Sequence, residues 1–507
     1  MPHYTRLGSS TALCALLAAG PAFADVTARQ VWDDMRGYVE GMGSAIEATE
    51  STSGDTLELA DIAISVPIPD VGGAVSVTVD ALSMTDNGDG TVSIVYPAEN
   101  RIRVEARPDE GEQVDMTLLL TQTGLEITAS GTPEQMTYDY EAQSVGLSLE
   151  RFERDGVPMP PEAMAIAMAM RDMTGQSVMS GDTVRNIAQV MTIAEITYDL
   201  NVAPPEESGR MALKGGMQGV SLDGTLAMPK GYDMTEMGAA LRAGYAVDST
   251  VSYTGGNADF NFEENGEVTA GTSSSDGGSL VTELNADRMR YAATGENTRM
   301  NIRGTALPVP VAFELGRTAF NLLTPVTASD EARPFELGLT LGDFTMDDQL
   351  WSIFDPQGAL PRDPATVSLD LSGALRLLVN IFEPLAMETM GSGDEVPMQP
   401  VDVSLNDLTV RAVGAELTGT GAATFDASDM TTFPGMPRPE GQIDLRLTGG
   451  NALIEKLVAM GLLPEEQAMG ARMMLGMFAV PAGEDTLTST IEINNQGHVI
   501  ANGQRLQ

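Results

Sequence analysis

The sequence predicts a mainly β protein of the α+β class, in which a long, coiled antiparallel sheet carries a few flanking amphipathic helices. The first observation is a period-two alternation of apolar and polar residues, as at 75–79 and 335–341, which is typical of strands with one buried face. The second is the presence of turn signals such as Asn87-Gly88 and Asn265-Gly266, which favour tight hairpins. Together they indicate hairpin-connected strands over most of the chain.

A recurring change of phase within single strands predicts bends in the sheet. In residues 57–64, 339–346 and 403–410 an alternating strand reaches an Asp, and the apolar positions then shift by one. Because a slip of one residue turns the following side chains to the other face, each site requires a bulge or a sharp bend. Two interpretations are open: a concave apolar groove that binds a ligand, or a closed sheet with a filled interior.

Helical patterns are fewer. In the first of them, Thr27 and Gln30 form a capping-box pair and apolar residues recur on one face. Pro160-Pro161 favours the start of a second, Met-rich helix, and Pro464 suits the start of the last one. The sequence predicts helical segments at residues 27–42, 162–173, 236–246, 348–354 and 452–478, the last of which is a helix pair.

The first 24 residues have the three parts of an export signal. Arg6 precedes a short apolar stretch, and Ala22-Phe23-Ala24 has the small-x-small pattern that signal peptidase reads. Cleavage is expected between Ala24 and Asp25, which predicts a periplasmic protein. Neither this apolar stretch nor any later one is long enough to span a bilayer, so no transmembrane anchor is expected after signal removal.

The mature chain is expected to contain two β-rich domains, at residues 25–330 and 331–507. The boundary is placed in the linker-like segment at 325–334, which is rich in Pro and polar residues.

The charge of the chain argues against two classes of partner. The formal net charge is −44, and the only lysines are Lys214, Lys230 and Lys456. Nucleic-acid binding requires a clustered basic face, and so does attraction to anionic lipid headgroups. The sequence therefore predicts no nucleic-acid partner, and its acidity is explained by solubility and self-repulsion.

The residues that most catalytic and metal sites need are scarce. The single cysteine, Cys14, lies in the signal segment, and His498 is the only histidine of the mature chain. Cys nucleophiles, His-based triads and His/Cys zinc sites are thus disfavoured, and no catalytic, cofactor-binding or metal-binding residue is assigned. Carboxylate-only chemistry on glycans remains an alternative, because 72 acidic residues supply many pairs.

Two short segments have weaker metal-binding alternatives. Residues 86–90 resemble part of a calcium loop but are better explained as a hairpin turn. The methionines at positions 159, 164, 168, 170 and 173 have ligands suited to Cu(I), but core packing explains them better.

Several segments resemble an uncharacterised bacterial family, DUF2125. They are residues 335–341, 347–356 and 360–366, together with Val31-Trp32, 53–56 and the ending 502–506. The resemblance spans nearly the whole mature chain, and it implies no activity or catalytic residue. The C-terminal pattern of strands, helix pair and closing hairpin is also similar to the end of AsmA-type envelope proteins, which implies a β-groove associated with lipid handling.

Three functions follow as hypotheses. The first is a non-catalytic periplasmic protein that binds lipid or another apolar ligand in a β-sheet groove for envelope maintenance. The second is a carboxylate-only enzyme acting on glycans, which is disfavoured by an aromatic content of 5%. The third is an envelope scaffold that binds another protein through an exposed strand edge.

Overall fold

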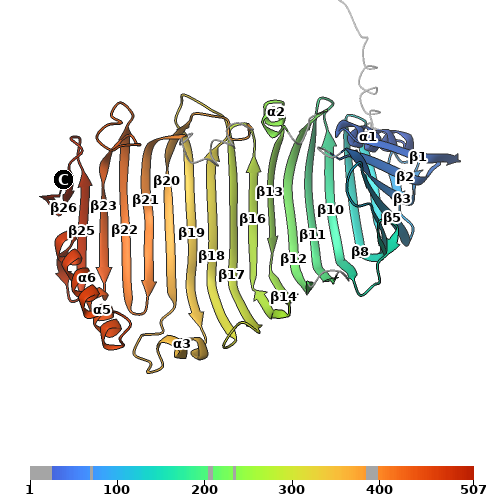
Figure 1. Cartoon of the computed structure of the whole chain (residues 1–507). Helices are drawn as coiled ribbons and strands as arrows, with labels where there is room; N and C mark the ends of the chain where they lie inside the picture. Colours follow the sequence, from blue (N-terminus) through green and yellow to red (C-terminus); the bar gives the residue numbers. More distant parts are fainter. Residues whose placement is uncertain (1–24, 69–71, 204–208, 232–235, 384–397, 507) are drawn as a thin grey trace, which may run out of the picture.

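The computed structural model describes residues 25–68, 72–203, 209–231, 236–383 and 398–506. These residues are mostly strand, and 27 strands belong to one antiparallel sheet. Figure 1 shows the sheet as a long row of upright strands that runs from the blue N-terminal part to the red C-terminal part. The predicted class, mainly β with a few helices, is confirmed.

The strands follow one another along the sheet in nearly their sequence order. In the first half of the sheet they are β1 (Ala45–Ser53), β2 (Thr56–Pro67), β3 (Gly73–Asp86), β4 (Val92–Val95), β5 (Glu99–Pro108), β6 (Val114–Thr123), β7 (Glu126–Thr132), β8 (Gln135–Arg154), β9 (Val157–Pro158), β10 (Met164–Ser180), β11 (Val184–Val202), β12 (Arg210–Pro229) and β13 (Ala246–Tyr253). In the second half they are β14 (Gly255–Glu264), β15 (Glu267–Ser275), β16 (Gly277–Leu284), β17 (Arg288–Gly304), β18 (Val311–Pro325), β19 (Arg333–Met346), β20 (Ala365–Leu377), β21 (Met398–Ala412), β22 (Ala415–Asp426), β23 (Arg438–Thr448), β24 (Val480–Gly483), β25 (Thr486–Ile493), β26 (Val499–Ala501) and β27 (Gln504–Arg505).

Four of the five predicted helical segments are confirmed. The described helices are α1 (Ala28–Gly41), α2 (Met237–Arg242), α3 (Asp348–Phe354), α5 (Gly450–Ala459) and α6 (Glu465–Phe478). The capping box of α1 is present, since the backbone N–H of Thr27 donates to Gln30 Oε1 over 2.9 Å and the backbone N–H of Gln30 donates to Thr27 Oγ1 over 3.3 Å.

The predicted helix at 162–173 is wrong. Residues 164–173 lie in β10, which pairs with β11 from Met164 onward and with β8 from Ala167 onward. Met164, Ile166 and Met168 are spaced by two, and this alternation fits a strand as well as it fits part of a helical face. The strand is favoured over the helix because β8 and β11 lie on either side of it. Their backbone groups accept and donate the hydrogen bonds that a helix would form within itself.

Several short strands are halves of one long strand. β13 and β14 pair one after the other with β12, and β15 and β16 do the same with β17. The sheet is therefore a single ladder in which each long strand is bonded to the strand before it and the strand after it. The proposed domain boundary near residue 330 falls in the β18–β19 connection, and these two strands pair with each other. A division into two folding units stays a prediction.

The predicted phase shifts coincide with irregularities in this ladder. Asp61 and Asp343 have positive φ angles of 48° and 53°. The register of β19 with β20 shifts between Leu341 and Phe344, and that of β21 with β22 shifts between Leu405 and Leu408. Each shift returns the apolar residues on its two sides to one face of the sheet.

Candidate functional site

One face of the sheet carries an apolar row along its length. Cross-strand partners point to the same face, so the register identifies the members of the row. The row crosses eighteen strands, which at about 4.8 Å between neighbours corresponds to about 80 Å along the sheet. In order, its members are Leu57, Met84, Ile94, Ile127, Tyr140, Gly175, Met191, Leu222, Val251, Leu280, Ala293, Phe320, Leu339, Leu369, Leu408, Gly419, Leu445 and Ser489.

The two glycines do not interrupt the row, because neighbouring side chains lie over them. A Cβ at Gly175 would be 2.5 Å from the ring of Tyr140, and one at Gly419 would be 2.7 Å from a methyl group of Leu445. Any larger residue at either position would have to displace its neighbour. The glycines therefore allow the large residues beside them to lie flat against the sheet.

A second apolar row lies beyond the line of irregularities. Its members are Leu120, Leu147, Met168, Tyr198, Gly215, Ala258, Ser273, Met300, Phe313 and Met346. The register shift in β19 places both rows on one side of the sheet, because Leu341 and Phe344 lie opposite Val367 and Ala365, two alternate residues of β20. The surface formed by the two rows and the apolar residues between them is called the apolar face below.

Helix α1 covers the apolar face at its N-terminal end. Val31 and Trp32 of α1 are 0% and 1% exposed, and they belong to a core that includes Leu57, Met84 and Ile94, the first three members of the long row. The indole N–H of Trp32 donates to Glu50 Oε1 over 2.8 Å, so the one polar atom of the ring is satisfied. At this end the apolar face is therefore packed against a helix and offers no open groove.

A buried ion pair also attaches α1 to the sheet. Arg185 at the start of β11 pairs with Asp34 of α1, and their side chains are 14% and 9% exposed. The hydroxyl of Tyr138 donates to Asp34 over 3.2 Å. Burial, together with the nearby charge of Asp34, raises the pKa of Tyr138, which keeps its hydroxyl protonated as a hydrogen-bond donor.

The middle of the apolar face is uncovered by the described residues. Leu341, Val367 and Val410 are consecutive cross-strand partners on β19, β20 and β21, and they are 41%, 43% and 39% exposed. These three side chains therefore form a contiguous exposed apolar surface among the described residues.

A shallow cavity of about 310 Å³ lies on the same face near the C-terminal end. Leu371, Leu405 and Ile443 form successive steps across β20 to β23, with Gly421 between the last two. The remaining lining residues are Val403, Ala422, Ala423, Pro439, Gly441, Gln442, Ile491 and Ile493. Gln442 supplies the only polar side chain, so the cavity selects for apolar surface.

The helix pair α5–α6 meets the apolar face at its C-terminal end. A Cβ at Gly450, the first residue of α5, would be 2.7 Å from a methyl group of Leu447, which is two residues from Leu445 on the same face. At the far end of the pair, the hydroxyl of Ser489 donates to the carbonyl of Phe478. Ser489 is the last member of the long row, so both ends of the helix pair contact this face.

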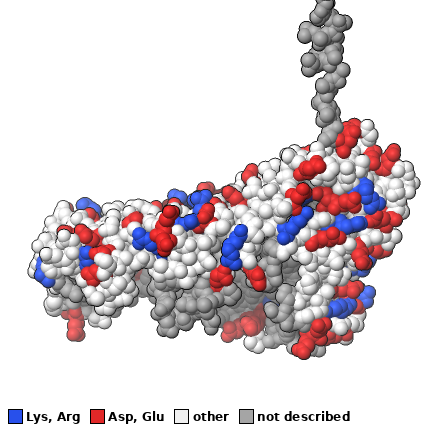
Figure 2. All heavy atoms as spheres, turned by 90° about the horizontal axis from the view of Figure 1, so that it is seen from above, with Lys and Arg blue, Asp and Glu red and all other residues white. Residues whose placement is uncertain are grey.

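Polar and charged side chains lie mainly on the opposite face of the sheet and along its edge. The row that alternates with the long apolar row is mostly polar over β7 to β12, with Thr128, Asp139, Gln176, Val190 and Asp223. Figure 2 shows acidic and basic side chains intermixed over the edge seen from above, and they are most abundant at the broad N-terminal end. No single-sign basic patch of the kind that binds phosphates appears in that view.

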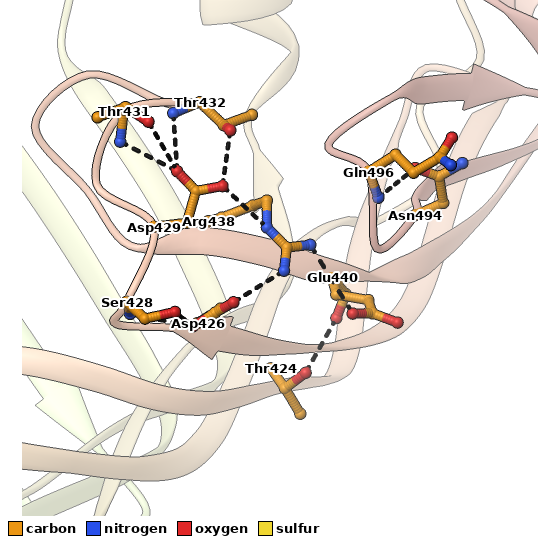
Figure 3. Close-up of polar contacts among 10 residues, drawn as sticks. All are labelled: Thr424, Asp426, Ser428, Asp429, Thr431, Thr432, Arg438, Glu440, Asn494 and Gln496. Carbon is orange, nitrogen blue, oxygen red and sulfur yellow. Dashed lines mark hydrogen bonds and ion pairs between the residues drawn. The ribbon is translucent and has the colours of Figure 1, made fainter.

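The densest polar cluster near the C-terminus surrounds Arg438 (Figure 3). The guanidinium, which is 12% exposed, lies 2.9 Å from Asp426 and 3.2 Å from Asp429, and Glu440 is 3.9 Å away. Asp429 also accepts hydrogen bonds from the backbone N–H groups of Thr431 and Thr432, both over 3.1 Å. The cluster fixes the connection between β22 and β23.

Acid is expected to loosen this connection. The hydroxyl and N–H of Thr432, with the N–H of Thr431, hold the pKa of Asp429 well below its ordinary value. A lowered pKa in the folded state gives stability that is present above the unfolded pKa, about 4, and is lost as the pH falls through the folded pKa. The protection of residues 427–437 from hydrogen exchange, relative to the intrinsic rate at each pH, is therefore expected to be constant down to about pH 4 and to fall below it.

The matched variants are Asp429→Asn and Asp363→Asn, the second at an exposed loop carboxylate. Asp429→Asn should speed exchange in this connection at neutral pH and weaken its acid dependence, while Asp363→Asn should leave both unchanged. Equal exchange profiles for Asp429→Asn and the unchanged protein would contradict the assignment.

The sequence-predicted site residues lie partly outside the described residues. Ala24 is not described, and Asp25 is the first residue that is. Val26 is 3% exposed, and its N–H donates to the carbonyl of Gly90 over 3.3 Å. The residues directly after the predicted cleavage site thus belong to the described fold, and the cleavage itself stays a prediction. His498 lies in the β25–β26 turn, where its N–H donates to Asn494 Oδ1 over 3.1 Å.

The metal and enzyme alternatives receive no positive support. Asp89 of the 86–90 segment accepts hydrogen bonds from both the N–H and the hydroxyl of Thr91, as in a hairpin turn. Among the described residues no group of three or more His, Cys, Asp and Glu side chains is arranged to hold a metal ion. Several carboxyl groups, including those of Glu150 and Asp444, have pKa values lowered by hydrogen-bond donors, whereas a general acid needs a raised one.

Two further findings concern membranes and strand edges. No described helix is both long and apolar enough to cross a bilayer. Within the described residues β1 pairs only with β2, so its other edge is available, and the protein-binding alternative stays open.

The fold and this face define a class: an antiparallel β protein whose single sheet presents a long apolar face, which the described part of the chain covers at its ends and leaves uncovered in its middle. Residues 232–502 match the family DUF2125, described as an uncharacterized protein conserved in bacteria. The chain belongs to the DUF2125 family. The predicted resemblance to DUF2125 is confirmed over residues 232–502, and the opening segments at Val31-Trp32 and 53–56 and the final residues 503–506 lie outside the match. The likeness to AsmA-type proteins stays a prediction.

Other comparisons add little. No curated protein matches the chain. Among solved structures, one match is titled "Crystal structure of ferric citrate transporter FecA in the unliganded form", with 9% sequence identity over 91% of this chain and 76% of that chain. Its TM-score is 0.15, and this likeness carries no inference about fold or function.

Proposed function

We propose that this chain is an exported, non-catalytic protein of the periplasm that binds acyl chains, or similar extended apolar ligands, on its apolar face. The observation that carries the proposal is the uncovered middle of that face, where Leu341, Val367 and Val410 form a continuous exposed series. Contiguous exposed apolar surface in a soluble protein marks an interaction site.

The chemistry of the face favours a class of ligand over one compound. Attraction to apolar surface is non-directional and scales with the area removed from water. The cavity beside Leu371 and Leu405 offers few hydrogen-bond donors that would recognise a particular headgroup. Between the ends covered by α1 and by the helix pair, the long row crosses eleven strands, from Tyr140 to Leu408, or about 50 Å. This length accommodates two acyl chains end to end, since each extends for about 20 Å or less, roughly the thickness of one bilayer leaflet. Binding of more than one lipid per chain is therefore expected.

The first experiment asks whether the purified chain carries lipid. Native mass spectrometry and organic extraction of protein purified from the periplasm should reveal bound acyl-chain lipids in a ratio above one per chain. A ligand-free protein that also fails to bind a fluorescent fatty acid would contradict the proposal. The mature N-terminus, read in the same spectra, should be Asp25 if cleavage follows Ala24.

A paired substitution locates the ligand. Val367→Thr combined with Val410→Thr changes two cross-strand partners that are 43% and 39% exposed, and Thr retains the β-branched shape that strands favour. Replacing two methyl groups by hydroxyls is expected to weaken fatty-acid affinity about tenfold, with little change in stability. Fluorescence titration and urea unfolding measure the two quantities.

The matched control is Val190→Thr. Val190 is 48% exposed and belongs to the polar row that alternates with the apolar row. It should leave the affinity unchanged. If Val190→Thr and the paired variant weaken binding equally, the ligand does not lie on the apolar face.

A further inference from the structure

Helix α6 exposes more large apolar side chains than its packing requires. Met469, Met473, Met474 and Met477 are 66%, 63%, 58% and 56% exposed. Their spacing of four, one and three residues places them on one side of the helix. The nearby glycines Gly470 and Gly476 have no atom within 4 Å of an added Cβ, so the helix surface there is open. We call these four methionines the methionine face.

The charged groups of the helix pair do not lie among these methionines in a way that would recruit phosphates. Arg472 is 3.5 Å from Glu455 of α5 and is directed to the other helix. Glu465 and Glu466 occupy the first turn of α6, and its last turn has no basic residue. An anionic surface would thus gain little from this helix, and any contact it makes depends on the apolar side chains.

The position of the helix pair connects the methionine face to the proposed binding surface. α5 begins against Leu447, and the end of α6 is bonded to Ser489, both on the apolar face. An acyl chain that leaves a lipid layer at α6 therefore meets the cavity lined by Ile443 and Ile491 one or two strands away. The helix that carries the methionine face thus ends beside Ser489, two residues from the cavity-lining Ile491 on β25.

A second copy of the chain is a poor occupant for the methionine face. A 14-residue helix is about 21 Å long, and one side of it buries far less than the 1,200 Å² or so of a stable interface. Two copies each carrying a net charge of −44 also repel one another. A lipid surface needs no fixed shape, and flexible methionine side chains adapt to such disordered apolar material.

We propose that the methionine face of α6 inserts into the surface of a lipid bilayer, and that acyl chains pass there between the bilayer and the apolar face. The inference rests on the proposed function for its second half. Insertion occurs through the apolar side chains of a helix lying in the interface, so it requires neither a membrane-spanning segment nor anionic lipid.

The test is flotation of the mature protein with vesicles of dioleoylphosphatidylcholine, at low and at high salt. The wild type is expected to float with the vesicles at both salt concentrations. A quadruple variant, M469Q with M473Q, M474Q and M477Q, keeps the side-chain length and helix propensity of the original residues. Its vesicle affinity is expected to fall about 100-fold, because four apolar side chains no longer enter the lipid.

The matched control changes exposed methionines that do not lie on a helix. Met430→Gln with Met436→Gln alters side chains that are 47% and 41% exposed between β22 and β23. This variant should float as the wild type does. Circular dichroism and urea unfolding establish that both variants are folded.

The outcomes separate the alternatives. Equal flotation of the quadruple variant and the wild type overturns the inference, and so does a wild type that never floats. Dimerisation of the wild type that is lost in the quadruple variant, without vesicle binding, identifies a second copy as the occupant and also overturns it. Fatty-acid binding measured without vesicles should be the same for the wild type and the quadruple variant. If the wild type floats but binds no fatty acid, the membrane contact stands and the proposed function fails.

Discussion

Replacing Trp32 by Ala is expected to lower the free energy of unfolding by about 3–5 kcal/mol, the range found when a large aromatic ring is removed from a packed core. Trp32 is 1% exposed and links α1 to the first strands of the sheet through its ring and its hydrogen bond to Glu50. The loss combines an unfilled cavity with an acceptor on Glu50 that no longer has its indole donor. Urea unfolding followed by circular dichroism measures the change.

Phe262→Ala is the control for this prediction, because Phe262 is an aromatic residue that is 43% exposed. It should cost much less than Trp32→Ala. If both variants lower the free energy of unfolding equally, the burial of Trp32 between α1 and the sheet does not explain its contribution to stability.

Arg185→Met is expected to destabilise the chain by about 3–5 kcal/mol, because it leaves a buried carboxylate without its cation. Asp34 is 9% exposed and also accepts the hydroxyl hydrogen bond of Tyr138. Replacing the remaining carboxylate with Asp34→Asn should restore part of the lost stability. The double variant Arg185→Met with Asp34→Asn is therefore expected to be more stable than Arg185→Met alone. Urea unfolding of four proteins, namely the wild type, Arg185→Met, Asp34→Asn and the double variant, measures the coupling.

An exposed ion pair provides the contrast. Arg171 and Glu195 lie 3.1 Å apart on neighbouring strands, with side chains 64% and 36% exposed. Arg171→Met should cost less than about 1 kcal/mol, since solvent screens such pairs. If Arg171→Met is as costly as Arg185→Met, the buried location of the Asp34 pair does not explain its effect.

Much of the sheet follows from local patterns in the sequence. The alternation of residues 335–341 is realised in β19, and Asn265-Gly266 forms the tight turn between β14 and β15 with both residues at positive φ. The phase shift at residues 403–410 predicted the bulge in β21, because apolar residues on its two sides have to reach one face. These features depend on neighbours within about eight residues of one another.

The error at 162–173 has a physical cause. An alternating Met/Ala segment has side chains of high helix propensity, and propensity is a weak guide where tertiary pairing is available. The strands that hold β10, namely β8 and β11, are themselves strongly alternating. Because apolar and polar residues alternate in all three consecutive segments, β8, β10 and β11, their pattern taken together favours a strand for the middle one.

The apolar face could not be predicted from the sequence to the same extent. The long apolar row combines residues from eighteen strands, and its existence depends on the register of every pair. Single-strand patterns predict that Leu339 and Leu341 face one side, yet they do not show that Val367 and Val410 lie beside them or that no described residue covers them. The spacing of Met469, Met473 and Met477 was visible, but only their exposure distinguishes a docking face from core packing.

The ladder also determines how the molecule tolerates change in its length. Each long strand touches only the strands next to it, as in solenoid proteins whose stability is a sum of local and nearest-neighbour terms. Inserting or deleting one complete hairpin preserves the alternation of strand direction and the positions of the end-covering helices. Evolution can therefore lengthen or shorten the apolar face in steps of two strands without redesigning either end.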